Sequence, residues 1–158
     1  MPQILDVLML GRCSHEFSWP ELQEQIVSAA EAMPATKYEF TPSEGEFKGV
    51  RTFARQVRHL SATNHILAAA ALGEEPPADA GDENGPETVR TKAEILDYLN
   101  SSFVHLGKAI DAIGEPNATV KASPISPLPA TRLALTVEAL VHAGAVRSHG
   151  HPPEIVGL

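Results

Sequence analysis

The sequence predicts an all-α fold, a four-helix bundle with long crossover connections. In four segments, apolar residues recur at the i, i+3, i+4, i+7 spacing that marks one face of a helix. The connections between these segments contain clustered proline and glycine, which interrupt regular structure. These connections are also too long for simple helical hairpins, so we expect crossovers within the bundle.

The predicted domain organisation is a lead-in at residues 1–17, a single helical domain at residues 18–153 and a tail at residues 154–158. A chain of 158 residues suits one domain with a core large enough to fold. The apolar stretch from Ile4 to Leu10 contains an acidic residue and has no basic leader, so it is a poor signal peptide. We therefore expect a cytoplasmic protein.

The first two predicted helices are separated by a loop. The first begins at Ser18, because a serine cap followed by a first-turn proline and a glutamate suits a helix start, and it ends before Pro34. The loop from Tyr38 to Gly49 is predicted from its proline and glycines. The second helix runs from about Val50 to Leu72. At about 100° per residue, His59 lies opposite the middle of the apolar stripe of this helix.

The last two predicted helices follow proline-rich connections. The segment from Ala78 to Pro86 is acidic and rich in glycine and proline, so we expect it to be exposed and mobile. The third helix runs from Thr88 to Ile113, and prolines then exclude a regular helix over residues 116–129. The fourth helix, from Thr131 to about Val146, has almost no polar face, which is typical of a central helix.

Composition argues against several classes of partner and site. The net charge of −8 argues against nucleic acid as the main partner, because phosphate binding needs clustered lysine and arginine. The single cysteine, Cys13, excludes an internal disulfide and a cysteine-rich zinc site. No apolar run approaches the length of a membrane span, so we expect no membrane partner. Glycine-rich phosphate loops and nucleophile elbows are also missing from the sequence.

Two histidines on separate predicted helices are the candidate functional residues. His59 lies on the second helix and His142 near the end of the fourth, and two imidazoles that meet in a bundle core can share a divalent metal ion. Glu138 is the only charged residue in the middle of the fourth helix. It lies four residues before His142 and on the same face, where it would act as a third ligand, orient His142 or form a salt bridge.

The five remaining histidines are predicted to have ordinary structural roles. They are expected to be unexceptional helix residues or solvated side chains: His15, His65, His105, His149 and His151. His149 lies seven residues beyond His142, about 10 Å along a helix axis, and reaches the same ion only if that helix breaks. These residues are not assigned to the candidate site. His151 stays an alternative for completing it, because the segment that carries this residue can fold back toward the ion.

The chain resembles the DinB-like family of small four-helix-bundle proteins over roughly residues 18–153. The densest part of the resemblance runs from Val50 to Pro77 and includes His59-Leu60. The run Thr131-Arg132-Leu133, with His142 ten residues after its arginine, is similar to the last core helix of the family. The all-α bundle read from the apolar pattern is also the fold that this resemblance implies.

The resemblance implies a divalent metal site built from three histidines. In the family one ligand lies on the second helix and two, spaced H-x-x-x-H, lie on the last. Carried onto this chain, the ligands are His59 and His142, and the position of the third is occupied by Val146. We expect zinc or nickel as the ion, with Glu138 as the carboxylate that completes the set. Dimers are common in the family, so a homodimer is expected.

Two functions are compatible with these residues. The resemblance implies a metal-dependent enzyme, either a thiol-dependent S-transferase or a hydrolase, that acts on a small-molecule substrate or a low-molecular-weight thiol. The alternative is a family member that has lost the metal and acts as a binding or dimerisation module. His59, His142 and Asn64 favour the enzyme. Val146, with a shortened segment before Pro152-Pro153, favours the alternative.

Overall fold

Three α-helices make up most of the part of the chain that the structure, a computed structural model, describes. That part is residues 19–45, 48–78, 80 and 83–113, and it contains no strand. The helices are α2 (Trp19–Ala32), α3 (Phe53–Leu72) and α4 (Lys92–Asp111), and a short 3-10 helix, η1 (Ala35–Lys37), follows α2. The predicted all-α fold class is therefore confirmed. The predicted fourth helix lies outside the described residues, as do the lead-in and the tail.

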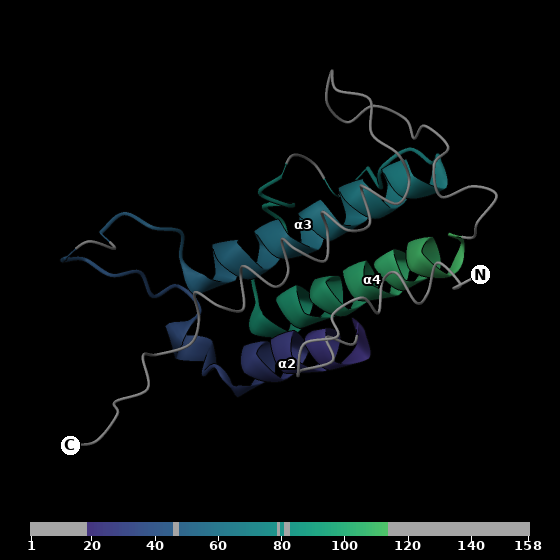
Figure 1. Cartoon of the computed structure of the whole chain (residues 1–158). Coiled ribbons are helices and arrows are strands. Elements are labelled where there is room, and N and C mark those ends of the chain that lie inside the picture. Colours follow the sequence, from purple (N-terminus) through teal and green to yellow (C-terminus); the bar gives the residue numbers. More distant parts are fainter. Residues whose placement is uncertain (1–18, 46–47, 79, 81–82, 114–158) are drawn as a thin grey trace.

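The described helices pack around α4. Helix α3 lies alongside α4, and α2 packs against another side of α4 (Figure 1). The core between the three helices and η1 contains buried apolar side chains: Leu22, Ile26, Ala30, Tyr38, Ala54, Val57, Leu60, Ile95, Leu99 and Phe103. The rings of Trp19 on α2 and Phe103 on α4 meet edge to face, with their centroids 5.5 Å apart. Among the described helices, none is both long enough and apolar enough to cross a membrane.

Helix α3 begins at Phe53, three residues after the predicted Val50, because Thr52 caps it. The Thr52 side chain accepts a hydrogen bond from the backbone N–H of Arg55, which satisfies one of the free donors of the first turn. The helix ends at Leu72, as predicted. Gly73 follows in the left-handed conformation, with φ of 77°, and its N–H bonds to carbonyls of the last turn.

Helix α4 also begins later than predicted, at Lys92 rather than Thr88, because a capping box sets its first residue. The Thr91 side chain accepts from the backbone N–H of Glu94, and the Glu94 carboxylate accepts from the backbone N–H of Thr91. Hydrogen bonds from the backbone N–H groups of Thr91 and Arg90 hold the pKa of Glu94 below its ordinary value. The helix ends at Asp111.

The segment between α3 and α4 is less exposed than the sequence predicts. Ala80 is fully buried, and Gly85 and Pro86 are half-buried against α3. The prediction of an exposed linker over Ala78 to Pro86 is wrong for these residues, because α3 supplies hydrogen-bond donors to the backbone of the segment. The loop predicted from Tyr38 to Gly49 contains no regular helix in its described residues.

Replacing a core leucine of α4 is expected to reduce stability far more than replacing an exposed valine of the same helix. Leu99 is 0% exposed and Val104 is 58% exposed. Leu99→Ala should lower the free energy of unfolding by about 2–5 kcal/mol, because it leaves a cavity. Val104→Ala should change it by less than about 0.5 kcal/mol. Urea denaturation of both variants measures the difference, and equal losses would contradict this core.

Replacing the Glu94 carboxylate is expected to change the pH dependence of stability. Because folding lowers the pKa of Glu94, its contribution is present above the unfolded pKa of about 4.3 and is lost as pH falls through the folded pKa. Glu94→Gln should therefore be less stable than the wild type at neutral pH, and the difference should narrow in acid. Denaturation at a series of pH values from neutral to acid measures the difference in stability. Asp97→Asn, at an exposed position on the same helix, is the control. A difference that does not vary with pH would contradict the capping box.

Candidate functional site

His59 is buried on α3, and its ring contacts the segment that leads to α4. The residue is 7% exposed, and Nδ1 of the ring is hydrogen-bonded to the backbone carbonyl oxygen of Glu83. A carbonyl oxygen can only accept, so Nδ1 carries the hydrogen of this bond. In a neutral imidazole the other nitrogen, Nε2, then holds the lone pair that a metal ion requires. The burial and the tautomer of His59 both fit a metal ligand.

The other members of the predicted site lie outside the described residues. These are Glu138 and His142, together with Val146 at the position of the third family ligand. Their approach to His59 stays a prediction. Within residues 19–113, apart from the gaps noted above, no group of three or more histidine, cysteine, aspartate or glutamate residues is arranged to hold a metal ion.

The segment that supplies the Glu83 carbonyl is held against α3 by the neighbour of His59. Nη1 of Arg58 donates to the carbonyl oxygens of Pro86, at 3.2 Å, and Val89, at 3.3 Å. Gly85 has φ of 74°, and a Cβ atom at this position would lie 3.0 Å from the carbonyl oxygen of Arg58. The close approach therefore needs glycine here, both for its backbone conformation and for space.

A pair of histidines that the sequence assigned to ordinary roles meets between α3 and α4. The Nδ1 atoms of His65 and His105 lie 3.0 Å apart, within hydrogen-bonding distance. Nε2 of His65 lies 3.3 Å from the hydroxyl of Ser101, and Nε2 of His105 lies 3.6 Å from a carboxylate oxygen of Glu74. The one sequence signal for this cluster is the position of His65 at the edge of the apolar stripe of its helix.

The hydrogens of this cluster follow from its acceptors. Ser101 donates its single hydroxyl hydrogen to the carbonyl oxygen of Tyr98, at 2.8 Å, so it accepts from Nε2 of His65. A neutral His65 then accepts at Nδ1, and His105 supplies the hydrogen that the two rings share. If the His105 ring carried hydrogens on both nitrogens, its positive charge would lie beside the Glu74 carboxylate. The cluster is thus a chain of polar contacts that joins the two helices.

Asn64, which accompanies the candidate ligand in the sequence, forms a second polar contact between these helices. It is fully buried, and its Nδ2 donates to the hydroxyl of Ser102 at 3.3 Å, while Ser102 donates to the carbonyl of Leu99 at 2.7 Å. The Oδ1 atom of Asn64 is buried without a hydrogen-bond partner among the described residues. In this part of the chain Asn64 therefore contributes to helix packing.

The family comparison covers every helix described above. The model of the DinB superfamily matches residues 19–146. The chain belongs to the DinB superfamily. The matched range includes both candidate histidines, Glu138 and Val146. The resemblance first read from the sequence is thus confirmed at the level of the superfamily.

A solved structure shares the fold of this chain. It is described as the crystal structure of the conserved protein of locus from Enterococcus faecalis. The two chains are 14% identical, and the similarity covers 82% of this chain and 86% of the other, with a TM-score of 0.62. At this identity the likeness shows the fold alone. The search of curated proteins found no match.

A side chain at Gly85 is expected to disturb the contact that orients His59. Gly45 has nearly the same φ, 77° against 74°, but nothing lies within 4 Å of its added Cβ, so Gly45→Ala is a matched control. Gly45→Ala should cost about 1–2 kcal/mol of stability from backbone strain alone. Gly85→Ala should cost about 1–3 kcal/mol more, because its Cβ also overlaps Arg58. Chemical denaturation measures both, and equal costs would contradict the close approach.

Proposed function

We propose that this DinB-like chain is a metal-dependent enzyme whose four-helix bundle brings His59, His142 and Glu138 around one zinc or nickel ion. The observation that carries the proposal is the contact between Nδ1 of His59 and the carbonyl oxygen of Glu83. Histidine ligands commonly donate one ring N–H to a carbonyl or carboxylate, which orients the ring and directs the other nitrogen to the ion. The sequence places His142 and Glu138 on one face of the predicted last helix.

The proposed reaction is thiol-dependent S-transfer or hydrolysis of a small molecule, in a cytoplasmic homodimer. A divalent ion at such a site polarises the substrate or lowers the pKa of a bound water or thiol. His59 binds the ion from α3, and the Glu83 carbonyl keeps its ring in the binding orientation. Glu138 completes the ligand set or orients His142 through its second ring nitrogen. The buried position of His59 keeps bulk water from the ligand.

One observation favours a second candidate, a DinB-like binding or dimerisation module without a metal. Val146 stands where the family places its third histidine. Catalytic metal sites commonly use three protein ligands, and two imidazoles alone bind an ion weakly. If Glu138 does not reach the ion, the bundle would keep its fold but would lack the metal and the activity that depends on it. Metal content separates the two candidates.

The decisive measurement is the metal content of protein purified without a histidine tag. The wild type should contain close to one zinc or nickel ion per chain, and His59→Ala and His142→Ala should lose it. His59→Asn also removes the ligand but keeps an N–H that can reach the Glu83 carbonyl. A loss of metal in this variant is therefore not explained by a loss of folding. His105→Ala, which removes a histidine outside the proposed site, should keep the ion.

Added Zn²⁺ or Ni²⁺ should raise the Tm of the metal-stripped wild type, because the ion binds the folded state, and should leave that of His59→Asn unchanged. Glu138→Gln should weaken the effect if the carboxylate is a ligand. A wild type with less than about 0.1 ion per chain and no change in Tm would reject the enzyme and leave the binding module.

A further inference from the structure

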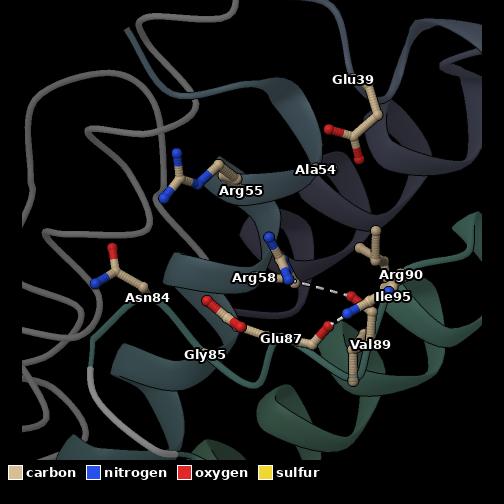
Figure 2. Close-up of a pocket in the computed structure, with 10 residues that line it drawn as sticks. All are labelled: Glu39, Ala54, Arg55, Arg58, Asn84, Gly85, Glu87, Val89, Arg90 and Ile95. Carbon is tan, nitrogen blue, oxygen red and sulfur yellow. Dashed lines mark hydrogen bonds between the residues drawn. The ribbon is translucent and has the colours of Figure 1, made fainter.

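A polar pocket is lined in part by the segment that His59 contacts. It has a volume of about 340 Å³ and lies between the first half of α3, the start of α4 and the segment that joins them. Three arginines line it: Arg55 and Arg58 from α3, and Arg90 from the residue before the Thr91 cap (Figure 2). Glu39 and Glu87 also contribute to the lining. The pocket is therefore rich in cations within a chain of net charge −8.

None of the ion pairs in the described part of the chain includes Arg55, Arg58 or Arg90. The ion pairs found there join Arg51 to Glu83 and His105 to Glu74. The nearest carboxylate influence is on Arg90, whose charge helps to lower the pKa of Glu94 and whose backbone N–H bonds that carboxylate. Glu39 and Glu87 line the same pocket, yet neither forms an ion pair with an arginine. The guanidinium groups of the pocket are thus not paired with Glu39 or Glu87, the two carboxylates that line it.

Two of the guanidinium groups are oriented by backbone carbonyls. Arg58 donates from Nη1 to the carbonyls of Pro86 and Val89, and Arg90 donates from Nε to the carbonyl of Glu87, at 2.9 Å. Figure 2 shows the contacts with Val89 and Glu87. Carbonyl oxygens orient a guanidinium without cancelling its charge. Among the described hydrogen bonds, none uses Nη2 of Arg58 or either terminal nitrogen of Arg90. These donors are already held in place for an additional acceptor.

We propose that this pocket binds a small oxyanion, the carboxylate or phosphate group of a small molecule. Guanidinium forks match the planar oxygens of both groups and form strong charge-assisted hydrogen bonds with them. Arg58 is half-buried, and its Nε is buried without a hydrogen-bond partner among the described residues. An anion in the pocket would offset the cost of removing this charge from water. The positive end of the α4 dipole adds to the attraction.

The size and the lining of the pocket restrict the ligand. A volume of about 340 Å³ lies at the lower end of small-molecule sites, which suits one anionic group or a compact metabolite. Glu39 and Glu87 at the same pocket disfavour a polyanion such as nucleic acid. We propose that this site is independent of the metal, since His59, the one proposed metal ligand among the described residues, does not line it.

The test is a titration of the ¹⁵N-labelled full chain with sodium phosphate and, separately, with sodium malonate, at constant ionic strength. Backbone amides of the pocket, such as Ala54, Gly85 and Arg90, should shift and saturate with a Kd of about 1–10 mM. Saturation by phosphate, by malonate or by both supports the site, and the tighter anion identifies the ligand class. Shifts that never saturate with either anion would overturn the proposal.

Variants that remove one arginine charge distinguish binding in the pocket from nonspecific attraction of the anion to the chain. Arg55→Gln and Arg90→Gln should each raise the Kd by about tenfold, the loss expected for one charge-assisted hydrogen bond. Arg51→Gln makes the same change of charge four residues before Arg55, ahead of the Thr52 cap and outside the pocket, so its Kd should match the wild type. An unchanged Kd in the Arg55→Gln and Arg90→Gln double variant would place the anion elsewhere and reject the site.

The metal proposal and the anion proposal can fail separately. The His59→Asn variant is expected to lose metal and to bind the anion as the wild type does. Far-UV circular dichroism checks that each variant stays folded. Weakened anion binding in His59→Asn with intact folding would show that the pocket depends on the metal site and would contradict the independence proposed above.

Discussion

The register between α3 and α4 is the constraint on which the described structure depends. Two polar contacts, between Asn64 and Ser102 and between His65 and His105, lie at this helix pair beside apolar side chains that tolerate sliding. Buried polar groups cost free energy when they lose their partners. A shift of one turn would separate both pairs at once, so the polar contacts select a single alignment. The apolar core then packs around that alignment.

This alignment also determines where the segment before α4 crosses α3. Arg58 and His59 are adjacent on the helix, and each bonds backbone carbonyls of this segment. These bonds hold the guanidinium of Arg58 beside the pocket and keep the ring of His59 in a single tautomer. The proposed metal ligand and the proposed anion site thus share one support, the segment before α4. A change that loosens the segment would affect both.

Local sequence patterns predicted the helices well, and long-range contacts account for the rest. Apolar periodicity and the stop at Gly73 are local, so the end of α3 was predicted correctly. The apolar stripe alone did not settle whether His59 is buried, because this residue lies opposite the stripe and is covered by a segment distant in sequence. The same segment was predicted to be exposed, since its composition does not reveal donors from Arg58. The meeting of His65 with His105 depends on helix register, which no local pattern contains.

The contact between α3 and α4 also has a kinetic consequence. The two helices follow one another in the chain, so their pairing closes a shorter loop than a contact between distant elements would require. We expect this helical pair to form early and to serve as the surface on which α2 docks. The hydrogen bonds from Arg58 to the segment before α4 would then form after the helices have paired. The support shared by both proposed sites would thus be completed late in folding.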